Sequence, residues 1–497
     1  MYKTEESSSY YHSLAQTQVT PIQRKERPMA QPAALKSVTP TSLTYCTFNP
    51  ATEELVKGYP TLTDNEAEAL LARAHDAYLT WRSVPVPERV RLFLKLAELL
   101  EANNERLAHQ VSLEMGKTLP QAKFEVALPV DMLRYYVRHA ESLLGDTEIE
   151  VAGFSRVYTR RESIGVTLGI SPWNGPIYQA GRVAAPNLLL GNAVILKPAE
   201  ITIGSTLILE ELIVEAGFPK GVFQTGALSH EQISRLIADP RIRAVTLTGS
   251  DRAGSVIGEQ AGRHIKPVVL ELGGSDPFIV LDSADVDAAA GTAAVCRLAL
   301  GGQVCVSPKR VIVTEKIAHA FITRYSEAFA NQKVGDPFDP ATTLGPVSSP
   351  AAVETLQQQY QDAVDKGATV LVEGGKVEGT GAYFKPAVLT GITRDMRLYH
   401  EEAFGPIGII HRVADADAAI ALANDSKYGL GGTVYAQDLT EAKRVAEALD
   451  TGMVGINQYL GAPVEIPFGG TKASGVDREL GSSGMDAFAN IKTYSLA

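Results

Sequence analysis

GVTLGI (165–170), NAVILKP (192–198), STLILEELIVEAG (205–217), GVFQT (221–225), AVTLTGS (244–250) and PVVLELGG (267–274) follow one another in the middle of the chain. Five of these segments are short apolar runs of the kind that form buried strands, and the segment 205–217 has the length of a helix. Strands that alternate with helices build parallel sheets that are covered by helices on both faces. The stretch therefore predicts an α/β fold with a doubly wound parallel sheet.

A second set of alternating segments follows residue 274. Its apolar runs and its one clear helical run are DPFIVL (276–281), RVIVTE (310–315), AHAFITRYSEAFA (318–330), TVLVEGG (369–375), GIIHRV (408–413) and GTVYA (432–436). The same alternation of apolar runs with a helical run predicts a second α/β unit with its own sheet.

Composition excludes several classes of protein. The chain has 497 residues, enough for two to four domains, with 21% charged residues and a net charge of -11. A negative surface repels nucleic acid and anionic lipid, and no run reaches the roughly 18 apolar residues that a membrane helix needs. Three cysteines cannot form a disulfide framework, and the scattered histidines contain neither HExxH nor CxxC. We therefore expect a cytoplasmic enzyme with no metal site, no nucleic-acid partner and no membrane partner.

The N-terminal region differs from the rest. Residues 1–45 are rich in Ser, Thr, Gln and Pro and have no period, so we expect a flexible arm there. Amphipathic helices follow, with starts expected at Asp64 and Pro87. Further on, the pair Arg160 and Arg161 and the C-terminal NIKTYSLA alternate like strands, and they could pair between subunits.

Three residues form a candidate catalytic set. Cys305 lies among small residues, and Lys309 and Arg310 would favour its thiolate if they pointed inward. Glu271 ends a predicted strand, where parallel sheets place ligands. Asn174 opens a helix, where its amide could serve as a cap or as a donor to an oxyanion. A thiol, an amide donor and a carboxylate fit the oxidation of a carbonyl compound through a covalent thioester.

The same predicted sheet offers residues for a dinucleotide that accepts the electrons. Lys197 and Glu200 follow one strand, and Gly249 and Ser250 follow another and open a helix whose amides could bind a pyrophosphate. The GxGxxG fingerprint is absent, so the residues alone leave this site open.

Together these motifs resemble the aldehyde dehydrogenase superfamily. SPWNGP, LKPAE, TLTGS, LELGG, GQVC, EEAFGP and PFGGTKASG occur in that family's order, and the resemblance covers about residues 46–497. It implies that Cys305 is the nucleophile, that Asn174 and the Cys305 amide form the oxyanion hole, and that Glu271 is the general base. The implied reaction is the NAD(P)+-dependent oxidation of an aldehyde to a carboxylic acid.

The resemblance also implies the cofactor contacts and the domains. Lys197 and Glu200 match the adenosine-ribose contacts, Gly249 and Ser250 the pyrophosphate region, and Trp173, Glu402 and Phe404 the surroundings of the nicotinamide ribose. The implied division is a dinucleotide-binding domain (46–140 and 163–273), a catalytic domain (274–468) and a small β oligomerisation element (141–162 and 485–497). A homodimer or homotetramer follows from the last of these.

Departures from the family pattern bear on the substrate. Gly175 stands where a large aromatic residue is common, and Tyr178 and Arg182 follow at positions that could face the substrate tunnel. Arg182 matches an arginine with which succinate-semialdehyde dehydrogenases bind the distal carboxylate, although it could equally form a structural salt bridge. A second such arginine is Ala299 here, so Arg297 would have to replace it. Asp477 stands where glycine is common.

These features lead us to expect succinate semialdehyde or a similar semialdehyde as the substrate. Because Gly175 opens the tunnel, an aromatic or other bulky aldehyde is the alternative. A CoA-acylating enzyme is less favoured because Glu271 is present, and a protein without activity because Cys305, Glu271 and Asn174 are all present. A cysteine esterase without cofactor would use the same thiol, and the response to added NAD(P)+ would distinguish it. Glu200 would bind the ribose hydroxyls and repel a 2′-phosphate, so we expect a preference for NAD+, with NADP+ possible.

Overall fold

The computed structural model describes residues 43–497, so the predicted arm lies outside the described residues except for its last three positions. Those three belong to strand β1 (Leu43–Phe48), which pairs antiparallel with β2 (Leu55–Pro60). Helix α2 (Asp64–Trp81) follows, and a capping box between Thr63 and Glu66 fixes its first turn. The helix start predicted at Asp64 is confirmed, and Pro87 lies in the first turn of α3 (Val86–Ala102).

The stretch that opened the analysis forms a six-stranded sheet. Its order is β21-β9-β8-β5-β6-β7, and every neighbouring pair is parallel except β21 with β9. The strands are β5 (Val166–Ile170), β6 (Ala193–Lys197), β7 (Phe223–Thr225), β8 (Ile242–Thr248), β9 (Val268–Glu271) and β21 (Gly475–Val476). The chain runs outward from β5 to β7 and returns to the other side of β5 with β8. The strand order therefore reverses next to β5, which is where open α/β sheets bind ligands.

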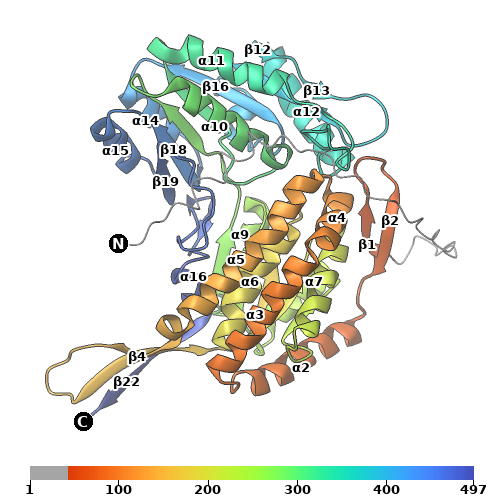
Figure 1. Cartoon of the computed structure of the whole chain (residues 1–497), viewed down its shortest axis with the longest axis vertical. Coiled ribbons are helices and arrows are strands. Elements are labelled where there is room, and N and C mark those ends of the chain that lie inside the picture. Colours follow the sequence, from red (N-terminus) through yellow and green to blue (C-terminus); the bar gives the residue numbers. More distant parts are fainter. Residues whose placement is uncertain (1–42) are drawn as a thin grey trace. The chain divides into compact units, whose positions relative to one another are not determined.

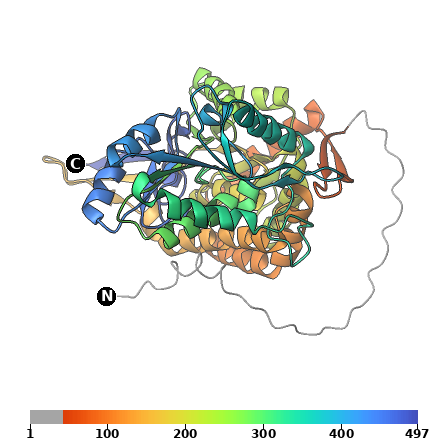
Figure 2. The same cartoon turned by 90° about the horizontal axis from the view of Figure 1, so that it is seen from above.

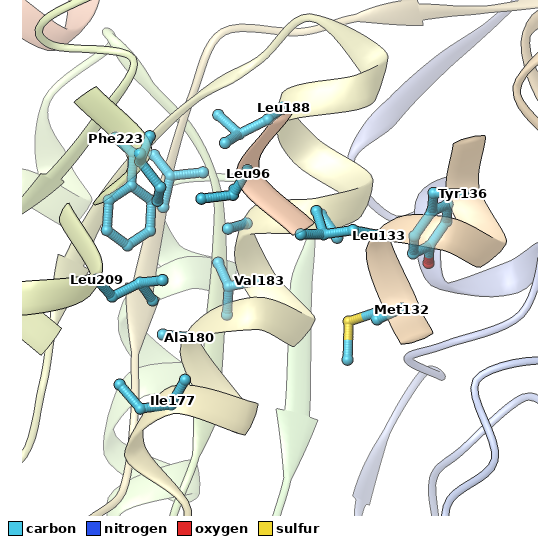
Figure 3. Close-up of a cluster of buried hydrophobic side chains, with 14 of the residues drawn as sticks. Leu96, Met132, Leu133, Tyr136, Ile177, Ala180, Val183, Leu188, Leu209 and Phe223 are labelled. Carbon is cyan, nitrogen blue, oxygen red and sulfur yellow. The ribbon is translucent and has the colours of Figure 1, made fainter. Parts of the chain in front are cut away.

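Helices cover both faces of this sheet (Figure 1). One face carries α6 (Pro176–Leu190) and α7 (Ile203–Glu215), over which α3, α4 (Asn104–Met115) and α5 (Leu119–Leu144) pack. The other face carries α2, α8 (His230–Ala238) and α9 (Asp251–Arg263). Figure 3 shows part of the first cluster, in which Leu96, Ile177, Leu209 and Phe223 from four elements are buried together. Burial on both faces fixes the carboxyl edge of the sheet.

A second sheet has seven strands, in the order β12-β15-β16-β11-β10-β18-β19, with only β12 antiparallel to its neighbour. Helices of this unit lie on either side of its strands (Figures 1 and 2). The strands are β10 (Pro277–Val280), β11 (Arg310–Thr314), β12 (Thr369–Val372), β15 (Ala387–Thr390), β16 (Ile407–Val413), β18 (Gly431–Tyr435) and β19 (Met453–Ile456). The helices are α10 (Val286–Leu298), α11 (Glu315–Ala330), α12 (Pro350–Asp365), α14 (Ala416–Asn424) and α15 (Leu439–Glu447). The predicted α/β class with two parallel-sheet units is confirmed.

A third sheet joins the two strand-like segments noted above. β4 (Arg156–Ser163) pairs antiparallel with β22 (Ala489–Leu496) and with β3 (Thr147–Glu148). β4 and β22 extend together away from the helices (Figure 1). The two segments thus pair with each other within one chain. The predicted oligomeric role of this sheet, like the predicted domain division, stays a prediction.

Short elements complete the fold. They are η2 (Glu200–Thr202), η3 (Ala299–Gly302), β13 (Gly375–Lys376), β14 (Phe384–Lys385), α13 (Arg397–His400), β17 (Tyr428–Gly429), β20 (Thr471–Lys472) and α16 (Ser483–Asp486). Within residues 43–497 we find no helix that could cross a lipid bilayer.

Candidate active site

The carboxyl edge of the six-stranded sheet gathers most of the predicted site residues. Asn174 follows β5, Lys197 ends β6, and Glu271 ends β9. Gly249 and Ser250 follow β8, which lies between β5 and β9. Parallel strands bring their carboxyl ends to one edge, so residues up to about a hundred positions apart share a crevice next to the reversal of strand order.

The nucleophile lies on a loop with unusual backbone geometry. Cys305 follows η3, in which Leu300, Gly301 and Gly302 have positive φ angles of 51°, 65° and 76°. A Cβ atom on Gly302 would lie 2.3 Å from the carbonyl oxygen of Gly405, so only glycine fits there. Three left-handed residues in succession turn the chain from α10 toward the crevice and present Cys305 to it.

Asn174 is held against that loop. Its side-chain Nδ2 donates to the carbonyl oxygen of Gln303 at 2.9 Å, two residues before the nucleophile. Its own carbonyl oxygen accepts a hydrogen bond of 2.7 Å from Nζ of Lys117. The residue is 9% exposed, so its position is fixed by contacts on both sides. The geometry therefore fits an amide donor beside the thiol better than a simple helix cap.

Lys117 and Glu125 are positioning residues that the sequence reasoning missed. Lys117 Nζ lies 2.5 Å from Oε2 of Glu125, and both side chains are buried. Oε1 of Glu125 accepts from the backbone N–H groups of Ile177 (2.8 Å) and Tyr178 (3.2 Å), at the start of α6. The pair thus links the carbonyl group of Asn174 to the backbone at the start of α6, the helix that follows this residue. The residues GK at 116–117 do not indicate these contacts, because Lys117 and Asn174 are 57 residues apart in the chain and meet only in the folded structure.

We expect Asn174→Ala to lower the turnover rate about a hundredfold. One donor to a developing oxyanion is worth about 3 kcal/mol, and the alanine leaves no group in its place. The rate of reduced-cofactor formation at saturating substrate measures the effect, and Asn331→Ala, an exposed residue at the end of α11, is the control. A loss of less than about threefold would show that Asn174 is only a structural residue.

Glu271 is a buried carboxylate without a hydrogen-bond partner among residues 43–497. The residue is 1% exposed, and neither of its carboxylate oxygens is hydrogen bonded. Burial raises the pKa of Glu271 well above its ordinary value; Arg182 and Arg478 oppose this rise, and Glu479 and Asp477 add to it. A carboxylate with a raised pKa and free lone pairs is suited to accept a proton from water or from a thiol near neutral pH.

The Cys305 thiol is not activated in the resting structure. Burial raises its pKa to about 12, although Lys309 and Arg182 act in the opposite direction. We expected Lys309 and Arg310 to favour the thiolate if they pointed inward, and of these two Lys309 acts on the thiol in this way. Arg310 instead donates to the carbonyl oxygens of Ser275, Leu422 and Ala423. The thiol therefore depends on a base to lose its proton at neutral pH.

The residues predicted to hold adenosine and pyrophosphate lie along the crevice. Nζ of the buried Lys197 is 3.8 Å from Glu200, whose side chain is 47% exposed. Ser250 is the N-cap of α9, where its hydroxyl accepts from the amide of Ala253 at 3.2 Å. Gly249 donates its amide to the carbonyl oxygen of Glu271 at 2.9 Å, which links the pyrophosphate region to the base.

The predicted surroundings of the nicotinamide ribose come from the second sheet. Glu402 accepts a hydrogen bond from the amide of Gly274 at 3.2 Å, and a Cβ on Gly273 would lie 2.5 Å from its carboxylate. The rings of Phe404 and Trp173 meet edge to face, with centroids 5.6 Å apart. The residues present thus fit a dinucleotide: a glycine-lined carboxylate for ribose hydroxyls, an aromatic corner for the ring and a helix N-terminus for phosphates.

On the substrate side, Arg182 lies in the wall beside the thiol. Its guanidinium forms an ion pair with Glu479 and lies 4.4 Å from the Phe468 ring and 5.4 Å from the Tyr178 ring. The residue is 3% exposed, and its Nε has no hydrogen-bond partner in the described part of the chain. A Cβ on Gly175 would meet its nearest neighbours at 3.8 Å, so a side chain would fit there.

Two expectations about the surroundings meet different outcomes. The suggestion that Arg297 replaces the second arginine is wrong, because its guanidinium is fully buried and donates to the carbonyl oxygens of Gly302, Ala403, Gly405 and Ile407. Asp477 has a φ of 70°, the left-handed conformation in which glycine is common, as its departure from the pattern indicated.

Fold and site together fit the class of dinucleotide-dependent oxidoreductases, with Cys305 as the candidate nucleophile. The chain belongs to the aldehyde dehydrogenase family, whose model matches residues 38–494. It is an NAD(P)-dependent oxidoreductase that acts on aldehydes.

Individual relatives are similar over nearly the whole chain. Succinate-semialdehyde dehydrogenase [NADP(+)] of Deinococcus radiodurans is 48% identical over 448 residues, which are 90% of this chain and 94% of that protein. The succinic semialdehyde dehydrogenase of Streptococcus pyogenes, solved with NADP+, superposes with a TM-score of 0.88 at 39% identity, over 91% of this chain and 99% of that one. A salicylaldehyde dehydrogenase of Pseudomonas putida G7, solved with salicylaldehyde, has a TM-score of 0.87 at 34% identity, over 91% and 94% of the two chains.

Proposed function

We propose that this protein oxidises succinate semialdehyde to succinate with NADP+, through a thioester on Cys305. The observation that carries the proposal is that the Asn174 amide is hydrogen bonded to the Cys305 loop, while the unpartnered carboxylate of Glu271 lies near enough to act on the charge of the Cys305 thiol. The names and identities of the relatives in Deinococcus radiodurans and Streptococcus pyogenes support the substrate class. The aromatic alternative has weaker support, since the salicylaldehyde enzyme is less similar.

Each residue has a defined role in the reaction, and Glu271 acts as a base twice, releasing the first proton to solvent before it takes the second. A base, Glu271, removes the Cys305 proton, and the thiolate adds to the aldehyde carbon to give a thiohemiacetal. The amide of Asn174 and the N–H of Cys305 stabilise the oxyanion that forms. A dinucleotide held by the residues named above would supply the oxidised nicotinamide that accepts a hydride, one proton with two electrons, from that carbon. Glu271 then removes a proton from water, which attacks the thioester and releases the carboxylate and the free thiol.

NADP+ is the proposed cofactor because the Deinococcus radiodurans relative is named for it and the Streptococcus pyogenes enzyme was solved with it. The sequence-based preference for NAD+ rested on Glu200 and has no support from them. The structure offers a reason, since the Glu200 side chain is half exposed and its carboxylate can turn to solvent, away from a 2′-phosphate. Lys197 would remain beside that phosphate as a cation. Ser250 at the start of α9, and Glu402 with Phe404 and Trp173, are the proposed contacts of the other half of the dinucleotide.

Arg182 is the proposed partner of the substrate carboxylate. It is buried in the wall beside Cys305 and Glu271, whose ionisation its charge already affects. Its unpartnered Nε could donate to a carboxylate that enters the tunnel, while Glu479 keeps the guanidinium in place. Half-buried Tyr178, stacked near it, would form the adjoining wall, and Gly175 leaves space at the start of α6.

Arg182→Met tests the proposed substrate. We expect kcat/KM for succinate semialdehyde to fall about a hundredfold and that for butanal or benzaldehyde to change less than about threefold, because only the first carries a charge. The double variant Arg182→Met/Glu479→Gln avoids an unpaired buried carboxylate, and its kcat/KM values should change in the same way as those of Arg182→Met. Equal losses for all three aldehydes would make Arg182 structural, and a wild-type enzyme that prefers benzaldehyde would overturn the substrate assignment.

We also propose a homodimer or homotetramer in the cytoplasm. The β4–β22 ribbon supports the proposed assembly, because Ile491 and Leu496 on β22 and Phe154 just before β4 are exposed apolar residues suited to an interface. The proposed cytoplasmic location is supported by the three cysteines, all of which are free thiols. Light scattering at several concentrations tests the assembly.

A further inference from the structure

Lys309 occupies a position between the nucleophile loop and the Glu402 carboxylate. Its side chain is 1% exposed, and its ammonium donates to the carbonyl oxygens of Val304 (2.8 Å) and Cys305 (2.6 Å). Nζ also lies 3.0 Å from Oε1 of Glu402. An ammonium has three N–H donors, and these three acceptors match them. The buried ammonium charge of Lys309 is therefore satisfied by hydrogen bonds and an ion pair within the protein.

The charges that face Cys305 come from four elements and act in opposite directions. Lys309 and Arg182 favour the thiolate, and Glu402 and Glu271 oppose it. Of the two cations, only Lys309 is hydrogen bonded to the backbone of the nucleophile itself. Because the same ammonium contacts Glu402, any group that draws the Glu402 carboxylate away changes the field at the thiol.

We propose that Lys309 is a positioning residue that couples occupation of the ribose site at Glu402 to the reactivity of Cys305. Its ammonium fixes the carbonyl groups on the thiol loop, so the Cys305 N–H and side chain keep one orientation toward Asn174. When ribose hydroxyls bind Glu402, Lys309 loses part of its counter-charge and stabilises the thiolate more strongly. This inference rests on the proposed role of Glu402 as the contact of the nicotinamide-side ribose.

The first experiment needs neither substrate nor cofactor. The rate at which iodoacetamide alkylates Cys305 is measured by mass spectrometry of its peptide between pH 7 and 10, with the full-length protein. In Lys309→Met the profile should move to higher pH by about one unit, and the rate at a given pH should fall about threefold to tenfold, since fewer thiolates form while each is more nucleophilic. Lys309→Arg keeps the charge and should retain the wild-type profile. Glu402→Gln should move it in the opposite direction.

Lys316→Gln is the matched control, because that lysine is 72% exposed at the start of α11, seven residues further along the chain. Its profile should equal that of the wild type. Circular dichroism and the melting temperature identify variants that fold. A folded Lys309→Met variant with an unchanged alkylation profile would overturn the proposal.

The second experiment tests the coupling. The probe is 2′-phospho-ADP-ribose, which carries the ribose hydroxyls but has no nicotinamide ring to cover the thiol. At a concentration shown by calorimetry to saturate the site, it should accelerate alkylation about threefold or more in the wild type and have no effect in Lys309→Met. Lys309→Arg keeps the charge and should retain at least part of the acceleration, because the coupling acts through the counter-charge that Glu402 supplies.

The outcomes separate this proposal from the proposed function. An equal acceleration in the wild type and in Lys309→Met would overturn the coupling. If Lys309→Met failed to fold, an acceleration in Glu402→Gln equal to that of the wild type, at a saturating concentration of the probe, would overturn it. A probe that does not bind the wild type would contradict the ribose site and the coupling together. The cofactor-free profiles of Lys309→Met and Lys309→Arg would still decide whether Lys309 acts on the thiol. An enzyme that prefers another aldehyde would leave the alkylation results unchanged.

Discussion

Replacing Cys305 by alanine should abolish aldehyde oxidation while the protein still binds its cofactor. Without the sulfur, no thiohemiacetal and no thioester form, so we expect a loss of at least about ten-thousand-fold in kcat. The side chain is small, so the loop around it, fixed by Gly302 and Lys309, should keep its shape. Formation of reduced cofactor at 340 nm measures the activity, and calorimetry measures cofactor binding.

Cys296→Ala is the control for that result. Cys296 is 4% exposed on α10, and burial raises the pKa of its thiol to about 12, so it should act only as a small apolar residue. Its removal should leave kcat within about twofold, as should that of Cys46 on β1. Retained turnover in Cys305→Ala, or a comparable loss in Cys296→Ala, would remove Cys305 as the nucleophile.

The pattern of strands was predictable because each one is continuous in the sequence. The runs at 165–170, 192–198 and 244–250 became β5, β6 and β8, since residues buried on both faces must be apolar throughout. β21 was not predicted, because a strand of two residues is too short to show a periodic pattern of apolar side chains. Its place beside β9 depends on the backbone pairing of Gly475 with Glu271, two hundred residues earlier.

The site was predictable only where its residues lie in motifs. Asn174 and Glu271 lie at or just after strand ends and Cys305 lies in the loop after η3, and the resemblance to a known family assigned their roles. Partners from distant segments were not visible: Glu479 binds Arg182 across 297 residues, and no local pattern marks that contact. The error on Arg297 has the same origin, because only the fold shows that backbone carbonyl groups already occupy its guanidinium.

The electrostatic balance at the thiol was also beyond the sequence. Basic residues next to a cysteine favour the thiolate in isolation, yet burial outweighs Lys309 and leaves the pKa of Cys305 at about 12. The loop can therefore hold the nucleophile neutral until a base acts on it. This makes Glu271 important in both halves of the reaction, and its variant is the most informative about their order.

Glu271→Gln should slow steady-state turnover about a thousandfold and leave a burst of one reduced cofactor per active site. The amide keeps the size of the side chain but cannot accept a proton from water, so the thioester accumulates. The first step has a second route, because the Cys305 proton can pass to solvent base, and the burst should become faster as pH rises toward the thiol pKa. Stopped-flow absorbance at 340 nm separates the burst from the steady state.

The pH dependence adds a signature that a loss of structure would not produce. A carboxylate acts as a base only when it is deprotonated, and burial raises the pKa of Glu271 well above its ordinary range. Steady-state turnover of the wild type should therefore rise with pH across the neutral range and fall as pH drops through that raised pKa. In Glu271→Gln this rise in the steady-state rate should disappear.

Glu259→Gln is the matched control, since Glu259 is an exposed residue of α9 that pairs with Arg263. It should keep both the burst and the wild-type pH profile. Loss of the burst as well as of turnover in Glu271→Gln would show that the base is indispensable for activating Cys305. An unchanged steady state would show that another group activates water. Because Glu271 has no hydrogen-bond partner in the described part of the chain, glutamine removes the proton acceptor without breaking a contact. A selective loss of thioester hydrolysis would therefore report on proton transfer alone.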